Sequence, residues 1–418
     1  MSSQFFKELG SNYFVHPEEN PEKALNAAAE KLGKHPLELI RHGWAGPIHQ
    51  LIHHPAVRDI MVQHGHKVWI RDSGGKKTET PAYLTTEWVD FLAYQWRYAN
   101  HITASQGKIP AVSELANFRH TLFFPRTGGG IRFQYVGRGF SALGSSVYIR
   151  RLRSEPFELE TLVKNGTLPQ GAADTIIAFM QAKTPIVISG QTGSGKTTLL
   201  GALAHKLQTL YDPINLLVVE KSHELPLKRP AYRWEQDAEG LVGLDQLAAN
   251  ATQMGLEWLI LGECTGPEAY FVLKAFTQGV PVMTTLHATS ATNGLTGLAM
   301  LALEYVREPE LLPTFLKNLA NEAVISIHLE NTERPDGVML GQVTGIEEII
   351  DVAGSKPVVN PIWVRKRDKN TGIPSLVFNR GCVVQASATT KFRFQQAGIE
   401  FPPQSVYSHA SAQAGSLV

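Results

Sequence analysis

Short, continuous apolar runs separated by helix-like stretches dominate the second half of the chain. Four of these runs lie at residues 186–189, 216–220, 258–262 and 282–286. Continuous rather than alternating apolar runs are typical of parallel strands that are covered by helices on both faces. The pattern therefore predicts an α/β domain with a parallel sheet at its core.

The first half of the chain has a different pattern. Short runs predict strands at 60–62, 67–71, 131–136 and 146–150, and a helical pattern separates the second strand from the third. This helix carries its apolar residues at helical spacing, which predicts a face buried in the core: Trp88, Phe91, Leu92, Trp96 and Ala99. Together these elements predict a small α+β domain ahead of the α/β domain.

Beyond the fourth apolar run, helices are expected at 294–306 and 308–320, and strands at 324–329, 338–349 and 362–367. We therefore divide the chain into five segments. They are a polar N-terminal arm (1–35), the α+β domain (36–150), a charged, proline-containing linker (151–170), the α/β domain (171–365), and a C-terminal extension ending in a flexible tail (366–418).

Composition narrows the class of protein. With 418 residues, 43% hydrophobic and 18% charged, the chain suits a multi-domain globular protein. The formal net charge of +1 gives no support to stable nucleic-acid binding. Two cysteines exclude a disulfide framework and a four-cysteine zinc site. The sequence shows no signal peptide and no apolar stretch of membrane-spanning length, which predicts a cytoplasmic protein.

The most specific motif follows the first apolar run. It has the form G-x-x-x-x-G-K-[ST], a phosphate-binding P-loop in a strand–loop–helix context. Glycines allow backbone amides to surround phosphates, the lysine reaches the β- and γ-phosphates, and the following threonine ligates Mg²⁺. The sequence therefore predicts ATP and Mg²⁺ at these residues: Gly190, Gln191, Thr192, Gly193, Ser194, Gly195, Lys196, Thr197 and Thr198.

Polar residues follow the other predicted strands. Glu220 and Glu224 come at and after the end of the second strand, Glu263 follows the third, and His287 follows the fourth. Ligands of open α/β sheets bind at the carboxyl ends of the strands. Phosphoryl transfer needs carboxylates to orient water and assist the metal, and a group that contacts the γ-phosphate. We expect these four side chains to surround the nucleotide.

The chain resembles the secretion ATPase superfamily in four ordered segments. These look like the Walker A motif, Asp box, Walker B motif and His box of that superfamily, and they lie at 190–198, 219–225, 262–269 and 284–288. The likeness is closest to the traffic ATPases of type IV secretion and conjugation. Pilus-retraction motors are similar but further away.

The resemblance implies a hexameric ring of two-domain subunits that hydrolyses ATP. It implies that Glu224 is the catalytic carboxylate, that Glu263 is the Walker B acid acting on Mg²⁺ through the nucleotide, and that His287 is the His-box histidine. Arginines from the first domain contact phosphates in this family. The candidates are Arg132, Arg150 and Arg151.

Two positions depart from the family pattern. Lys221 stands where many relatives have an aspartate, and Thr265 stands where an arginine is common. The chain also lacks the cysteine quartet of the type II secretion and pilus-assembly branch.

We therefore interpret the chain as an ATPase motor at the cytoplasmic face of a bacterial inner membrane. It would associate only peripherally with the membrane, through the proteins of a type IV secretion or conjugation machine. A pilus-retraction ATPase has the same chemistry and remains an alternative. A DNA-translocating ring ATPase is a further alternative, which the near-neutral charge does not favour.

Overall fold

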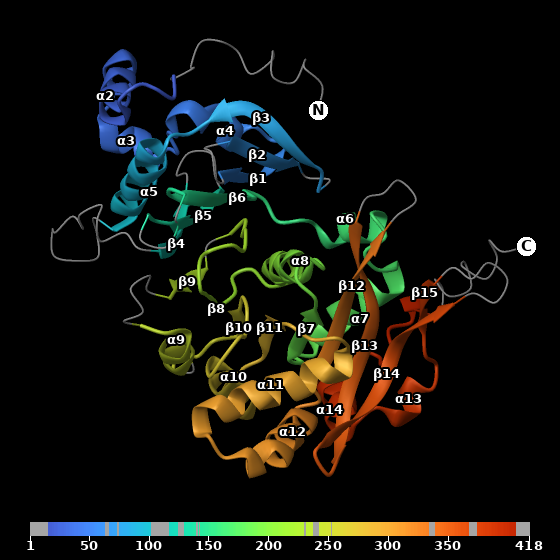
Figure 1. Ribbon diagram of the computed structural model, residues 1–418. Coiled ribbons are helices and arrows are strands. Elements are labelled where there is room, and N and C mark those ends of the chain that lie inside the picture. Colours follow the sequence, from blue (N-terminus) through green and yellow to red (C-terminus); the bar gives the residue numbers. More distant parts are fainter. Residues whose placement is uncertain are drawn as a thin grey trace, which may run out of the picture. The chain divides into compact units, whose positions relative to one another are not determined.

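The computed structural model in Figure 1 divides into two compact units, Met1–Glu155 (unit 1) and Pro156–Val418 (unit 2). The structure describes residues 16–62, 67–72, 75–101, 117–123, 129–138, 141, 143–229, 231–236, 242–251, 253–333, 339–367 and 374–406. Residues 1–15 of the predicted arm and 407–418 of the predicted tail lie outside this range.

Unit 1 is a six-stranded antiparallel sheet with helices. Its strands run in the order β3-β2-β1-β6-β5-β4. Its elements are α2 (Pro21–Leu32), α3 (Pro36–Arg41), η2 (Gly46–Ile48), α4 (His49–His53), β1 (Val57–Val62), β2 (Lys67–Asp72), β3 (Lys77–Tyr83), α5 (Thr86–His101), β4 (Asn117–Phe123), β5 (Gly130–Val136) and β6 (Ser146–Leu152).

One face of this sheet and helix α5 form the core of unit 1. Ile60 and Ile149 are fully buried in it, and Trp88 and Trp96 contribute the large side chains of the helix. The Thr85 hydroxyl accepts the backbone N–H of Trp88 at 3.4 Å, which caps the first turn of the helix. The predicted strands and tryptophan-rich core face are confirmed for these residues.

Unit 2 contains the longer sheet. Its elements are α6 (Leu159–Lys164), α7 (Gln170–Gln181), β7 (Ile186–Gly190), α8 (Lys196–Leu210), β8 (Leu216–Glu220), β9 (Tyr232–Glu235), α9 (Leu244–Ala251), β10 (Trp258–Leu261), α10 (Glu268–Thr277), β11 (Val282–Leu286), α11 (Ala291–Val306), η5 (Pro309–Leu311), α12 (Leu312–Asn321), β12 (Ile325–Glu333), β13 (Met339–Ala353), β14 (Lys356–Arg367), β15 (Pro374–Phe378), α13 (Cys382–Gln385) and α14 (Ala388–Gln396).

The strands of unit 2 run in the order β15-β14-β13-β12-β7-β11-β10-β8-β9. From β12 to β9 all neighbours are parallel, which confirms the predicted parallel core. From β12 to β15 all neighbours are antiparallel, so the whole sheet is mixed. The sequence did not predict this antiparallel extension.

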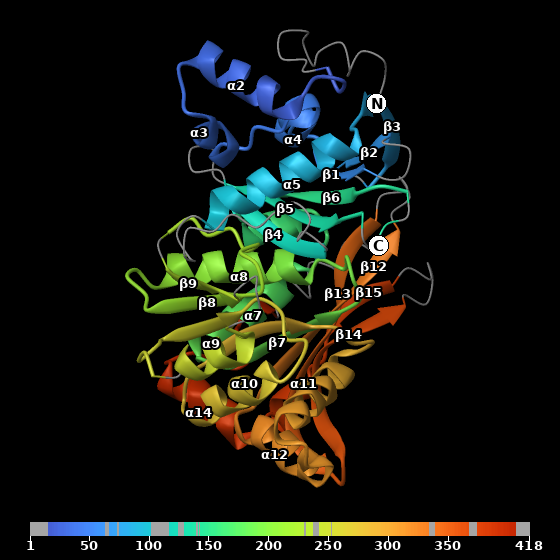
Figure 2. The same cartoon turned by 60° about the vertical axis from the view of Figure 1, so that its left-hand side comes forward.

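Helices cover both faces of the unit 2 sheet. Ile186 and Ile188 pack in a cluster with residues of α7 and α8, whereas Val187, between them, packs in a second cluster with α10, α11 and α12. Figure 2 shows α10, α11 and α12 together on one side of the sheet. Burial on both faces explains why these strands are apolar at every position.

Several element boundaries differ from the pattern. The stretch expected to be a linker contains α6, and the division between the units lies within it. Helix α11 begins earlier than expected because the Ser290 hydroxyl caps it by accepting the N–H of Asn293. The segment after residue 365 adds β15 to the sheet, and its Phe394 lies in the core. Among the described residues, no helix has the length and apolarity to span a membrane.

Candidate functional site

The P-loop connects the buried strand β7 to helix α8. Its glycines have positive φ angles of 153° at Gly190, 81° at Gly193 and 90° at Gly195. Such angles favour glycine, since other residues seldom adopt them. A Cβ at Gly190 would also collide with the carbonyl oxygen of Leu329. These angles and close contacts give the loop the tight turn that a P-loop needs to wrap its backbone around a phosphate group.

Lys196 stands at the start of α8 and is 7% exposed. Its Nζ donates hydrogen bonds of 2.9 Å to the carbonyl oxygens of Gly190 and Gln191. Burial lowers the pKa of Lys196, and the charge of Glu263 partly opposes this effect. The ammonium group is thus held inside its own loop by neutral carbonyls, which an anionic phosphate can replace.

Two further predicted residues meet Lys196. His287 follows β11, and its Nδ1 lies 3.4 Å from the Lys196 Nζ. Glu263 follows β10, and its Oε1 lies 3.1 Å from the Nε2 of His287. Because β7, β11 and β10 are neighbouring parallel strands, their carboxyl ends bring lysine, histidine and carboxylate into one chain of contacts.

Glu220 ends β8 and is buried. Its Oε1 accepts the backbone N–H groups of Glu224 and Leu225, both at 2.9 Å, and its Oε2 accepts a hydrogen bond from Arg233 at 3.0 Å. The Glu220 side chain also lies against Gly262, where a Cβ would approach its Cγ to 3.0 Å. With both oxygens engaged, Glu220 is suited to fix the loop that carries Glu224.

Glu224 lies in the loop after β8, and its Oε1 accepts a hydrogen bond from the Ser222 hydroxyl at 3.2 Å. Its backbone is tied to Glu220, which in turn touches the residue before Glu263. The predicted acids therefore form two adjoining groups. Glu220 and Glu224 stand at the end of β8, and Glu263 stands with His287 at the ends of β10 and β11.

The two departures from the family pattern contact each other. The Lys221 ammonium donates a hydrogen bond to the Thr265 hydroxyl. The loop of Thr265 is held by the buried Glu268, whose Oε1 accepts the N–H groups of Thr265 at 2.6 Å and Gly266 at 3.0 Å. A lysine–threonine contact thus joins the loops after β8 and β10.

Sequence reasoning missed the β12–β13 hairpin that supports the P-loop. Leu329 pairs with Gly190, and a Cβ on Gly341 would collide with the carbonyl oxygen of Ser194. His328, beside them, contacts the hydroxyl of Ser189. Strands were predicted at 324–329 and 338–349, but their position beside the P-loop was not. The pairing of β12 with β7 joins residues far apart in the chain, and no motif indicates it.

The residues present fit a magnesium nucleotide. The Ser194 hydroxyl is buried with no hydrogen-bond partner among the described residues, so it is available to an incoming group. Thr197 is exposed in the first turn of α8, where its hydroxyl can ligate a metal bound to the phosphates. Within the described ranges, no group of three or more His, Cys, Asp or Glu residues could hold a metal by itself. A metal would therefore depend on phosphate oxygens as ligands.

Arg150, one of the predicted arginines of unit 1, lies beside Asp59, which is 0% exposed. Arg150 pairs across the strands with both Asp59 and Arg132, and its Nε donates to the Asp59 carboxylate at 2.8 Å. Arg71 and Arg58 complete the ion-pair cluster at 3.6 and 3.3 Å. Burial opposes ionisation of Asp59, but Arg150 and Arg58 outweigh this and hold its pKa below the ordinary value.

Arg151, the third candidate, has a different role. Its guanidinium donates hydrogen bonds to the backbone carbonyls of His54 and Val57. It therefore fastens the start of β1 to β6.

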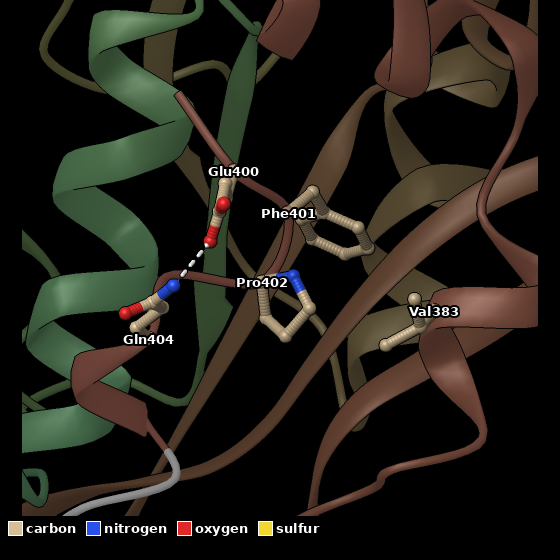
Figure 3. A pocket seen from close by; sticks show the side chains of 5 residues that line it. All are labelled: Val383, Glu400, Phe401, Pro402 and Gln404. Atoms are coloured by element: carbon tan, nitrogen blue, oxygen red, sulfur yellow. Dashed lines mark hydrogen bonds between the residues drawn. The ribbon is translucent and has the colours of Figure 1, made fainter. Parts of the chain in front are cut away.

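A separate pocket of about 610 Å³ lies in the C-terminal part of unit 2 (Figure 3). Gln404 donates a hydrogen bond of 2.9 Å to Glu400 at its edge, and the other lining residues are Val383, Phe401 and Pro402. None of the predicted site residues lines this pocket.

Residues 140–329 match the family model described as "Type II/IV secretion system protein". A probable conjugal transfer protein TrbB of Sinorhizobium fredii is 28% identical over 165 residues, which cover 39% of this chain and 50% of the relative. The type IV secretion system protein VirB11 of Bartonella henselae is 31% identical over 131 residues, covering 30% of this chain and 36% of the relative. The chain spans about half the length of the two TrbB relatives that it matches.

The X-ray structure of the Legionella pneumophila ATPase DotB superposes with a TM-score of 0.53 and 18% identity, covering 81% of this chain and 84% of that one. At this identity the likeness establishes a shared fold. The family match and the relatives confirm the predicted resemblance to the secretion ATPase superfamily.

Proposed function

We propose that the chain is an ATP-hydrolysing ring motor, because its residues 140–329 match the family model of type II/IV secretion system proteins. It energises a type IV secretion or conjugative transfer machine at the bacterial inner membrane. The observation that carries this proposal is the meeting of Lys196, His287 and Glu263 at the carboxyl edge of one parallel sheet. The TrbB and VirB11 relatives support the choice of machine.

The residues of unit 2 have distinct roles in this proposal. The P-loop amides and Lys196 bind the phosphates, and Thr197 and Glu263 hold Mg²⁺, which neutralises charge on the phosphates. Glu224 orients the attacking water and accepts its proton. It is suited to this role because its carboxylate lies in the loop after β8, which adjoins the loop of the metal-binding Glu263. His287 contacts the γ-phosphate, and its hydrogen bond to Glu263 links that carboxylate to the bound phosphate.

Unit 1 supplies positive charge. Arg132 and Arg150 stand opposite each other on neighbouring strands, away from the core face. We propose that they contact the nucleotide phosphates and that six copies of the chain form a closed ring. The ring associates peripherally with the cytoplasmic face of the inner membrane through proteins of the secretion machine.

Phosphate release tests this function directly. The full chain with ATP and Mg²⁺ should release inorganic phosphate, and the same sample with EDTA should not. Light scattering with ATP and Mg²⁺ should give the mass of a hexamer. A chain that binds no nucleotide would contradict the enzyme, and a strictly monomeric chain at micromolar concentration would contradict the ring.

A further inference from the structure

His328 lies on β12 directly beside Ser189, the last residue before the P-loop motif. The histidine is 4% exposed, and its Nδ1 lies 2.9 Å from the Ser189 hydroxyl oxygen. It is therefore an ionisable group enclosed beneath the proposed phosphate site, and the roles proposed above do not use it.

The charged groups that face His328 come from three elements. Glu330, on the same strand, places its Oε1 3.8 Å from the His328 Nε2, and its other oxygen accepts a hydrogen bond from Arg365 of β14 at 2.7 Å. Lys196 of α8 acts on His328 by like-charge repulsion. Strand β7 contributes a neutral group, the Ser189 hydroxyl, which in turn lies 3.3 Å from the carbonyl oxygen of Ser290, the residue before α11. Strand β13 adds the Thr344 hydroxyl, which donates to the His328 carbonyl at 3.5 Å.

This environment sets the hydrogen bonds of the neutral ring. The Glu330 carboxylate favours a proton on Nε2, which leaves Nδ1 as an acceptor for the Ser189 hydroxyl. A second proton would convert Nδ1 into a donor. The Ser189 hydroxyl would then donate to the carbonyl of Ser290 at 3.3 Å or of Ile327 at 3.4 Å. A proton on His328 therefore changes the hydrogen bonding at the base of the P-loop.

The surrounding charges determine whether phosphate binding favours or opposes protonation of His328. Burial lowers the pKa of His328, Glu330 opposes the shift, and Lys196 adds to it. A phosphate group bound to Lys196 would cancel the repulsion between the ammonium and a protonated His328. By linkage, a ligand that favours protonation is itself bound more tightly by the protonated protein.

We propose that His328 is a positioning residue that couples proton uptake to nucleotide binding. Binding of the phosphates draws a proton onto His328, and the protonated ring turns the Ser189 hydroxyl toward the carbonyl of Ser290 or of Ile327. This inference rests on the proposed nucleotide site and adds its regulation by pH. Nucleotide affinity therefore falls as the pH rises through the pKa of His328.

Calorimetry of the full chain measures the coupling. Mg-ADP is titrated at pH 6.0 in two buffers with different ionisation enthalpies, which gives the number of protons taken up. His328→Asn keeps an acceptor near the Nδ1 position but cannot titrate. The wild type should take up more protons than this variant. Its affinity should fall about fivefold more than the variant's between pH 6 and 8.

His205→Asn is the matched control, because His205 is a buried histidine of α8 that faces Glu158 instead of the P-loop. This variant should retain the wild-type proton uptake. Any proton uptake at the other groups of the nucleotide site is common to all the variants and cancels in the comparison. Glu330→Gln provides a second test through a half-exposed residue, and it should reduce the uptake by removing the carboxylate that faces Nε2.

Equal proton uptake in the wild type, His328→Asn and Glu330→Gln would overturn this inference while leaving the nucleotide site intact. ADP binding with the expected uptake, but without ATP hydrolysis, would overturn the proposed enzyme and support the coupling. Absence of ADP binding would overturn both.

Discussion

The two units hold their candidate phosphate-binding cations in opposite ways. In unit 2, Lys196 rests on the neutral carbonyls of Gly190 and Gln191. In unit 1, Arg150 is bound to the carboxylate of Asp59, which also attracts Arg58 and Arg71. The contacts described for the lysine include no direct carboxylate partner, so it can pair with an incoming anion, whereas the arginines share a fixed, buried counter-ion.

This difference indicates that Lys196 serves ligand binding, whereas the ion pairs of Asp59 serve the stability of unit 1. Burying a cation that only carbonyl oxygens contact costs desolvation free energy. A phosphate that replaces the carbonyls offsets this cost, because it forms a charge-assisted hydrogen bond with the cation. The ion pairs of Asp59 instead fix where the arginines lie on the face of the sheet. Removal of Lys196 should therefore affect function, and removal of the Asp59 charge should affect folding.

Lys196→Ala should cause the largest effect. Without the ammonium group the phosphates lose their main charge partner, and ATP hydrolysis should fall about 1,000-fold, together with weaker binding. Thermal unfolding should change little, because the lost hydrogen bonds are to loop carbonyls. The exposed Lys274 of α10 gives the matched control, and Lys274→Ala should keep full activity. Normal ATP affinity in Lys196→Ala would remove the lysine from the site.

Asp59→Asn should affect unit 1 and spare the P-loop. The change leaves three arginines without their shared carboxylate and should lower the free energy of unfolding by about 3 kcal/mol. Urea denaturation followed by tryptophan fluorescence measures the loss. ADP affinity of the folded variant should show whether the P-loop is unchanged. Unchanged stability would mean that Asp59 does not hold the arginine cluster.

The histidines of α4 should make unit 1 sensitive to acid. Burial, and secondarily the charge of His53, lowers the pKa of His49 to about 4, although the Gly43 carbonyl acts in the opposite direction. Between pH 6.5 and about 4 the unfolded chain binds a proton at His49 that the folded chain does not. The stability contributed by His49 is therefore fully present above pH 6.5 and is lost as the pH falls.

His49→Phe removes this titration and should reduce the acid-induced loss of stability by about 2 kcal/mol. Hydrogen exchange of the amides of unit 1 gives its free energy of unfolding at pH 7 and at pH 4.5, and the change between the two pH values tests the difference. Identical pH dependence in the wild type and the variant would contradict the assignment.

The sequence predicted those parts of the molecule whose signals are local. The apolar runs of β7, β8, β10 and β11 identified the parallel core, and the glycines with Lys196 identified the loop. These signals depend on neighbouring residues in the chain, so no knowledge of strand pairing was needed.

Contacts between distant segments could not be read in the same way. Asp59 is a single acid in an apolar strand, and its arginine partners lie up to 91 residues away. His328 lies beside Ser189 only because β12 pairs with β7, and Lys221 meets Thr265 only because β8 and β10 are neighbours. Strand order decides these contacts, and the apolar pattern does not reveal strand order.

The central claim is that the carboxyl edge of the parallel sheet hydrolyses ATP with Glu224 as its base. ATP binding and phosphate release, measured on the same preparation of Glu224→Gln, test it most directly. We predict unchanged Mg-ATP affinity, with phosphate release reduced at least about 100-fold. Normal phosphate release by Glu224→Gln would contradict the claim.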